Sequence, residues 1–246
     1  MNRSLFFSAV RTKPFGKALT QSQVNGLTAI LDEWDRRRLT DLRHLAYMMA
    51  TVFGECGENM QPVREGFKKT DAESRAYVKR KGYKYGKAEN GHVYYGRGLV
   101  QITWAENYQK MGKILGIDLY NKPDRALELP VAVAIMFEGM TRGTFTGKKL
   151  SDYFRGKIED WRSARRIINR LDRAGEIAGY AREFHTALLK AETSGVATQT
   201  DALIPNTGDV TGPVATTPTP DFTSFARFVA ILVDAIKKLV QRWKGK

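Results

Sequence analysis

The chain has 246 residues, 42% of them hydrophobic and 11% aromatic, and a net charge of +14. This length and composition fit one globular domain of ordinary size with additional segments. The single cysteine, Cys56, excludes an internal disulfide, so the fold does not depend on an oxidising compartment. The charge indicates attraction to an anionic partner, and nucleic acid, anionic lipid and cell-wall polymer all qualify.

Two amphipathic helices are predicted in the N-terminal part of the chain. A capping-box pattern at residues 20–23 precedes apolar residues at helical spacing, which predicts a helix over about 21–36. A second amphipathic run follows Asp41 and predicts a helix that ends near Gly54 or Gly57.

The middle of the chain is predicted to be mostly helical as well. Residues 66–90 are rich in Lys, Gly and Tyr, and we expect a mobile loop or a short hairpin there. Their charges form either a solvated surface or the basic rim of a cleft. Helical patterns return at about 104–115, 129–142, 159–170 and 174–192. The pattern predicts a mostly α fold, in which a helical body and a smaller lobe with a β-hairpin flank a cleft.

Composition changes after residue 192, which divides the chain into a principal domain at 1–192 and two further segments. Residues 193–220 contain Thr, Gly, Ala and four prolines and predict an extended linker. Residues 221–246 place apolar side chains on one helical face and basic ones opposite, and their charges interrupt any run long enough to span a membrane. We expect a basic amphipathic helix on an anionic membrane or lipopolysaccharide surface; the alternative is docking on a partner or self-association.

The stretch from Tyr94 to Tyr108 combines aromatic rings, glycines, an arginine, amides and a hydroxyl. Rings provide stacking area and polar side chains provide directional hydrogen bonds, which suits a cleft wall that grips a polar, ring-shaped substrate. The alternative is an aromatic turn ahead of a helix.

Carboxylates for acid–base chemistry lie upstream of this stretch. Glu55 follows an apolar helix, and apolar walls around it would keep it protonated, as a general acid requires. Glu58 and Glu65 follow, the latter beyond Pro62, where a carboxylate can face the first across a cleft. An acid for the leaving oxygen and a base for a water are what a glycosidase needs. The alternative is that Glu55 is an ordinary surface residue at a helix end.

Three segments together resemble glycoside hydrolase family 19, which contains chitinases and many phage and bacterial lysozyme-type enzymes. They are the stretch 94–108, the helix end at 50–55, and Ile167-Ile168-Asn169, in the family's order along the chain. The resemblance covers about residues 5–190, and the segments 6–34 and 61–65 look more like phage endolysins than plant chitinases. It implies a lysozyme-like fold for this catalytic domain and an inverting mechanism without metal or organic cofactor.

The resemblance also implies roles for individual residues. Glu55 would be the general acid and Glu65 the base that activates water. Thr103, counted with the catalytic residues, would hold substrate or the attacking water. The substrate-binding residues would be Tyr95 and Trp104, which shape the cleft, Gln101 and Asn107, which hold substrate or water, and Asn169 on the opposite wall.

Departures from the family pattern leave one assignment open. Gly54 stands where the family has His before the acid, and the disulfides of the plant enzymes are excluded by the single cysteine. Because the segment between the first and second carboxylates is short, Glu58 and Glu73 remain candidates for the base beside Glu65.

We therefore expect an endolysin-like glycosidase of muramidase type that cuts the glycan strands of peptidoglycan, since chitin is neutral and bacterial envelopes are anionic. The alternatives are a chitinase, or a membrane-active or wall-binding protein with an inactive glycosidase site. A peptidase using Cys56 with His44, His92 or His185 is a weaker option, because these residues form no motif. No His/Cys cluster has zinc-ligand spacing, and no nucleic-acid-binding motif occurs.

The expected site of action is the periplasm or cell wall, by an unknown delivery route. The apolar run near Phe6 is too short for a signal-peptide core, so we expect synthesis in the cytoplasm. We expect the protein to be a monomer.

Overall fold

A computed structural model describes residues 1–200 of the chain, and the side chains of residues 1–193. The described part is predominantly helical, as predicted, with two small antiparallel sheets. Its helices are α1 (Arg3–Thr12), α2 (Gln21–Arg37), α3 (Leu42–Glu55), α4 (Asp71–Arg80), α5 (Ala105–Leu115), α6 (Leu129–Arg142), α7 (Leu150–Tyr153) and α8 (Ala174–Thr200). The strands are β1 (Val63–Arg64), β2 (Arg97–Gly98), β3 (Phe154–Arg155) and β4 (Ile158–Glu159).

Helices α2, α3 and α6 confirm the predicted ones, because local capping and periodicity determine them. Thr20 and Gln23 form the capping box of α2, with each side chain accepting the other residue's backbone N–H. Asp41 caps α3 by accepting from the N–H of Arg43.

Three regions differ from prediction. Residues 66–90 contain helix α4, whose capping box of Thr70 and Glu73 outweighs the surrounding lysines and glycines. In place of a hairpin, an isolated bridge joins Glu89 to His92 at the end of this segment. The predicted helix at 159–170 is replaced by strand β4 and the 3₁₀ turn η5 (Ser163–Ile167). Helix α1, which was not predicted, is capped by Asn2 and packs on α8.

The core of the domain is built around α3 and α8. All residues from Leu45 to Phe53 on α3 are buried, and α3 packs along α8. The backbone N–H of Asn2 donates to Ala191 O at 3.0 Å, which ties the start of the chain to the same helix. Helix α8 therefore supports both the N-terminal segment and the end of α3.

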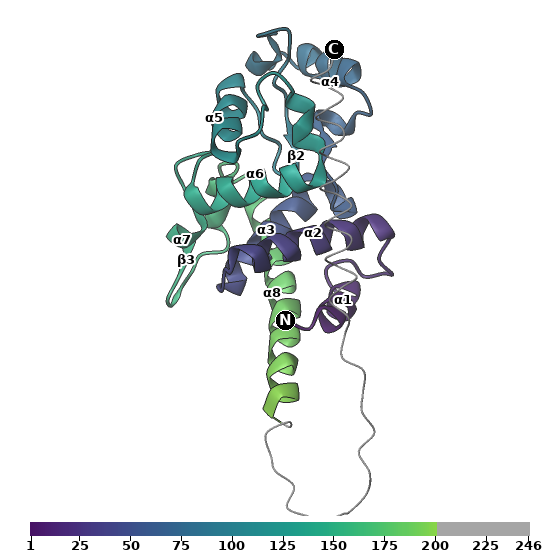
Figure 1. The fold of residues 1–246 in the computed structure, drawn as a ribbon, viewed down its shortest axis with the longest axis vertical. Coiled ribbons are helices and arrows are strands. Elements are labelled where there is room, and N and C mark those ends of the chain that lie inside the picture. The colour runs from purple at the N-terminus through teal and green to yellow at the C-terminus, as the bar shows by residue number, and fades with distance from the viewer. Residues whose placement is uncertain (201–246) are drawn as a thin grey trace, which may run out of the picture. The chain divides into compact units, whose positions relative to one another are not determined.

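The other end of the domain holds the Tyr94–Tyr108 stretch. Figure 1 shows α4, α5 and β2 at one end of the described part and α1, α2 and α3 toward the other, with α6 between them. Strand β1 pairs with β2, Val63 opposite Gly98 and Arg64 opposite Arg97. This register places the residue after β1, Glu65, beside the backbone of Gly96.

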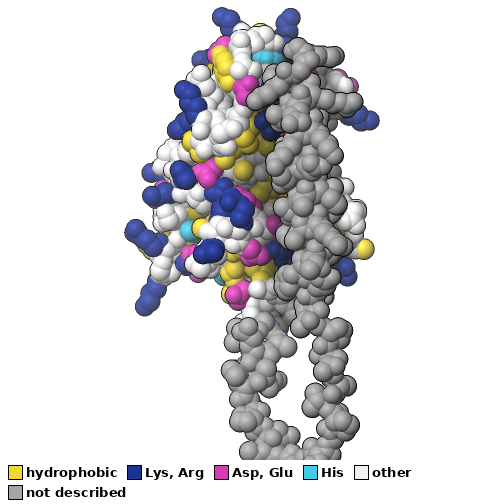
Figure 2. All heavy atoms as spheres, in the orientation of Figure 1, with side chains coloured by type: hydrophobic (Ala, Val, Ile, Leu, Met, Phe, Trp, Pro, Cys, Tyr) yellow, Lys and Arg dark blue, Asp and Glu magenta, His cyan; other side chains and the backbone are white. Residues whose placement is uncertain are grey.

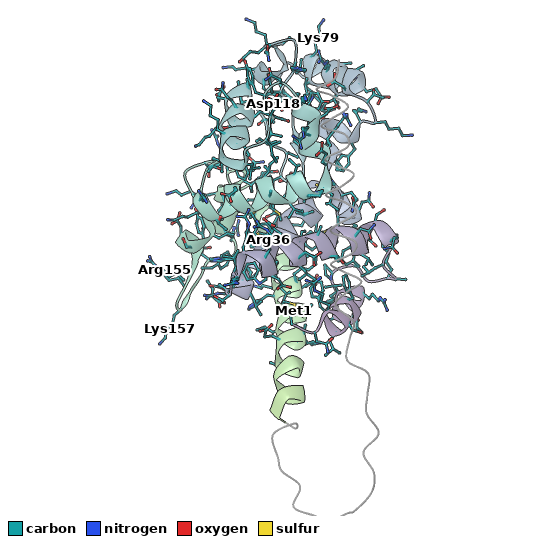
Figure 3. All side chains as sticks on the ribbon, in the orientation of Figure 1. Met1, Arg36, Lys79, Asp118, Arg155 and Lys157 are labelled. Atoms are coloured by element: carbon teal, nitrogen blue, oxygen red, sulfur yellow. The ribbon has the colours of Figure 1, made fainter. Side chains whose placement is uncertain are left out.

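Basic side chains are spread over the surface. Figure 2 shows Lys and Arg over the visible face of the described residues, with Asp and Glu among them. Arg155 and Lys157 project from the β3–β4 hairpin (Figure 3). No helix in residues 1–200 has the length and apolarity required to cross a bilayer.

Two predicted segments fall partly or wholly outside the described residues. Helix α8 continues to Thr200, so the first eight residues of the predicted linker at 193–220 are helical. The rest of the linker and the predicted amphipathic helix at 221–246 lie outside the described part.

Candidate active site

Glu55 is the last residue of α3, and its side chain is 20% exposed. We expected apolar walls around it, and the structure instead places the guanidinium of Arg165 at 2.5 Å from Glu55 Oε1. The Arg165 side chain is only 3% exposed, and its Nε donates to Asp172 O at 2.8 Å. A buried arginine from η5 therefore fixes the orientation of this carboxyl group.

The residue before Glu55 explains one departure from the family pattern. A Cβ on Gly54 would lie 2.2 Å from Ile177 Cδ1 on α8, so a side chain there would require this methyl group to move. The carbonyl oxygen of Gly54 accepts from Arg173 Nη1 at 3.0 Å. The side chain of Ile177 therefore lies in the space beside Gly54, where the family has an imidazole.

Glu65 begins the 3₁₀ turn η2 (Glu65–Phe67) after β1 and is held by neutral donors. Its Oε1 accepts from the hydroxyl of Tyr85 at 2.6 Å, and its Oε2 accepts from the backbone N–H of Gly96 at 2.8 Å. The backbone N–H of Glu65 donates to Gly96 O at 2.8 Å. Burial and the neighbouring Glu65 raise the pKa of Tyr85, so its hydroxyl stays protonated and remains a donor.

The other two candidate bases have structural partners. Glu58 is 49% exposed and forms an ion pair with Lys17 at 2.5 Å. Glu73 accepts from the backbone N–H groups of Lys69 and Thr70, both at 3.0 Å, at the start of α4. Of the three, Glu65 alone contacts the Tyr94–Tyr108 stretch.

Within that stretch, Gln101 and Trp104 have strained backbones, with φ of +53° and +72°. Such angles are costly for residues other than glycine, and they often occur at functional sites. Gln101 Nε2 donates to Val63 O and to Gly98 O, each at 3.0 Å, and this bridges β1 and β2. Trp104 is 40% exposed despite its size, and its ring lies edge-on to Tyr85 at 5.5 Å.

Thr103 and Asn107 lie close to these residues. Both are partly exposed, and Asn107 Nδ2 donates to Thr103 O at 2.8 Å at the first turn of α5.

Tyr95 lies elsewhere than the sequence led us to expect. Its side chain is fully buried, its hydroxyl donates to Asp71 at 2.8 Å, and the guanidinium of Arg97 lies 3.6 Å from its ring centre. Arg97 itself is 1% exposed and also pairs with Asp124 at 2.8 Å. The Tyr95 side chain is therefore inaccessible to a substrate, and its ring packs beneath the Tyr94–Tyr108 stretch.

The end of α3 contacts the Tyr94–Tyr108 stretch through Cys56. Its sulfur lies 3.5 Å from Gly98 O and 3.4 Å from Leu99 O. Burial raises the pKa of the Cys56 thiol, which disfavours a thiolate nucleophile. Cys56 therefore serves as a packing contact between the segments that bear Glu55 and Glu65.

Asn169 is exposed, and its backbone N–H donates to Arg165 O at 2.9 Å. The η5 turn thus connects Asn169 to the Arg165–Glu55 pair. Sequence reasoning missed Arg165 and Tyr85. The only signals for them were an arginine pair directly before Ile167-Ile168-Asn169 and tyrosines within a lysine-rich segment.

Metal binding is not indicated for the described residues. Within residues 1–200, no three His, Cys, Asp or Glu side chains are grouped so that they could hold a metal ion.

The glycoside hydrolase family 19 model, described as class I chitinase, matches residues 56–142. The match includes Glu65 and the whole Tyr94–Tyr108 stretch, whereas Glu55 lies one residue before it and Asn169 beyond it.

Curated relatives match over short segments. Endochitinase CH5B of Phaseolus vulgaris is 56% identical over 34 residues, which are 14% of this chain and 10% of the relative. Endochitinase A2 of Pisum sativum is 48% identical over 42 residues, 17% of this chain and 13% of the relative. Inactive chitinase-like protein 1 of Hevea brasiliensis is 53% identical over 34 residues, 14% of this chain and 11% of the relative. The chain thus spans only about a tenth of the length of these relatives, and one of them is named as inactive.

Solved structures match over more of the chain at lower identity. A bacterial family 19 chitinase has a TM-score of 0.46 and 20% identity over 75% of this chain and 93% of its own. Chitinase C from Streptomyces griseus HUT6037 has a TM-score of 0.43 and 17% identity over 77% of this chain and 91% of its own.

Proposed function

We propose that this chain is a member of glycoside hydrolase family 19, whose model matches residues 56–142, and that it hydrolyses a glycan that contains N-acetylglucosamine. One observation carries the proposal: Glu65, inside the matched segment, is held by Tyr85 and Gly96 while Cys56, next to Glu55, packs on the same stretch. Glu55 and Glu65 lie on adjoining segments and have different surroundings, as the acid and the base of a catalytic pair do.

In this mechanism Glu55 gives its proton to the oxygen of the leaving sugar. Arg165 orients the carboxyl group and stabilises the carboxylate that remains. Glu65 accepts a proton from the water that attacks the anomeric carbon from the opposite face, so the configuration at that carbon inverts. Thr103, Gln101 and Asn107 would orient substrate or water, and Trp104, which is 40% exposed, would stack on a sugar.

The names of the relatives favour chitin-type chains as the substrate, since the curated matches include endochitinases. A second candidate, peptidoglycan, is favoured by the net charge of +14, because a basic protein is attracted to an anionic wall. Both polymers contain N-acetylglucosamine, so one active site can be tested on both.

The decisive experiment incubates wild type and Glu55→Gln with N-acetylglucosamine oligosaccharides and with purified peptidoglycan. Mass spectrometry of the products identifies the new reducing end and therefore the bond that is cut. We expect wild type to cut at least one of them and Glu55→Gln to lose activity by about 10²–10⁴-fold, the contribution of general acid catalysis. A wild type that cuts neither, or a fully active Glu55→Gln, would contradict the proposal and leave a binding protein with an inactive site.

For the segment 221–246, outside the described residues, we propose a separate role at an anionic membrane or lipopolysaccharide surface of the cell envelope. Deletion of 221–246 should then leave cleavage of the isolated polymer unchanged and reduce lysis of intact cells. Equal losses on both substrates would instead indicate that the segment supports the fold.

A further inference from the structure

A pocket of about 340 Å³ is lined by Tyr85, the residue whose hydroxyl contacts Glu65. One wall comes from the 3₁₀ turn η3 (Lys84–Gly86) and the residues after it, and the other from Trp104 and the start of α5. Tyr85 connects the pocket to the proposed base, because its ring lines the wall while its hydroxyl donates to Glu65 at 2.6 Å. A group in this pocket would therefore lie next to the reacting sugar.

The pocket is lined by aromatic rings, two lysines and two glutamates. Trp104 is 40% exposed, and Tyr85 packs edge-on to it. Lys84 and Lys87 are exposed, and neither has a carboxylate within 4.0 Å among the described residues. Of the acidic residues, Glu89 accepts from the hydroxyl of Tyr120 at 3.0 Å and Glu106 lies in the first turn of α5.

These contacts define the ligand chemistry. Two ammonium groups in a pocket that aromatic rings also line suit a carboxylate attached to a planar or ring-shaped group. Chitin-type chains bear no carboxylate. Peptidoglycan bears carboxylates on its peptide stems and, where a stem has been removed, on the lactyl ether of the sugar.

We propose that this pocket is a specificity subsite in which Lys84 and Lys87 bind a carboxylate of peptidoglycan and so favour it over a neutral glycan. The inference rests on the proposed function, because it takes the glycosidase activity at Glu55 and Glu65 as given. The lysines act on substrate binding, so their contribution falls on KM and leaves kcat nearly unchanged.

The test compares Lys84→Gln/Lys87→Gln with the matched control Lys113→Gln/Lys122→Gln, which removes two exposed positive charges outside the pocket. Each variant is assayed on intact peptidoglycan, on glycan strands whose stems an amidase has removed, and on N-acetylglucosamine oligosaccharides. Because exposed ion pairs are worth up to ~1 kcal/mol each, we expect the pocket variant to raise KM on intact peptidoglycan by about three- to tenfold. The increase should shrink at high salt and be absent for the neutral oligosaccharides and for the control variant.

The stripped strands identify the source of the carboxylate. An effect that persists on them assigns the lactyl carboxylate, and an effect that vanishes assigns the stem. Equal losses on the neutral oligosaccharides, equal losses in the control variant, or an unchanged KM on intact peptidoglycan would overturn the subsite. A wild type that cuts only the neutral oligosaccharides would overturn the subsite but keep the glycosidase, whereas a wild type that cuts none of the three would overturn both.

Discussion

The ends of α3 and β1 each present a glutamate, and the two carboxyl groups have opposite surroundings. Glu55 contacts the guanidinium of Arg165, a side chain that is 3% exposed. Glu65 contacts a phenol hydroxyl and a backbone N–H, both of them neutral donors. The same residue type is therefore held by a positive charge in one place and by dipoles in the other.

This difference is consistent with separate roles. Arg165 orients Glu55, and it pairs with the carboxylate that remains once Glu55 has given its proton to the leaving oxygen. Neutral donors orient a carboxylate without the full attraction of an ion pair, so Glu65 can still accept a proton from water.

The largest effect is expected at Glu65. Glu65→Gln keeps the size of the side chain and can still accept from Tyr85, but it can no longer take a proton from water. We expect kcat to fall by about 10²–10⁴-fold with little change in thermal stability. Glu58→Gln and Glu73→Gln are the matched controls and should keep most of the activity. Loss of activity in Glu58→Gln alone would move the base to that residue.

The next effect is expected at Arg165, which acts through Glu55. Arg165→Met removes the charge and keeps a long side chain, whereas Arg165→Lys keeps the charge but lacks the planar guanidinium. Because hydrogen bonds to charged groups are worth about 1.5–3 kcal/mol, kcat should fall by about 10- to 100-fold in Arg165→Met.

Arg165→Lys should recover part of this loss, and KM should stay nearly constant in both variants. Thermal melts separate this effect from unfolding, because Arg165 is buried. If both variants lose the same activity in proportion to stability, Arg165 has a structural role only.

Tyr85→Phe should have a smaller effect, since it removes one of the two neutral donors to Glu65. A hydrogen bond to a carboxylate is worth about 1.5 kcal/mol at the low end of its range, and with the N–H of Gly96 still in place we expect kcat to fall by roughly tenfold. Tyr83 packs against Tyr85 at 5.2 Å and is the matched control, so Tyr83→Phe should behave like wild type. Steady-state kinetics of the two variants decide whether the hydroxyl or the ring of Tyr85 matters.

The sequence predicted the elements that depend on neighbours along the chain. Helices α2 and α3 follow from their caps and apolar periodicity, and the Gln101–Asn107 grouping follows from residues that are adjacent in sequence. Helix α4 was missed because lysines and glycines were given more weight than the Thr70–Glu73 capping box.

The contacts that distinguish the two carboxylates were not predictable in this way. Arg165 reaches Glu55 from a turn far along the chain, and Tyr85 reaches Glu65 from beyond α4. Burial of Tyr95 likewise depends on Arg97 and Asp71, which tertiary packing brings together. Residue types can indicate a carboxylate pair, but tertiary structure decides what surrounds each member.

The smallest effect is expected at Gly54, where a substitution tests whether Ile177 on α8 leaves room for a side chain before Glu55. Gly54→His introduces the family's residue, but its Cβ would lie 2.2 Å from Ile177 Cδ1. Overpacking of this kind costs about 1–3 kcal/mol, so the melting temperature should fall. Ile177→Ala in the same chain opens the space and should make the histidine less destabilising than it is alone, as a double-mutant cycle measures. If the two substitutions lower the free energy of unfolding additively, Ile177 on α8 does not clash with the imidazole. If Ile177→Ala reduces the destabilisation caused by Gly54→His, the packing of α8 on α3 excludes the histidine that the family has at this position. Arg165 is then the charged partner of Glu55 in this chain.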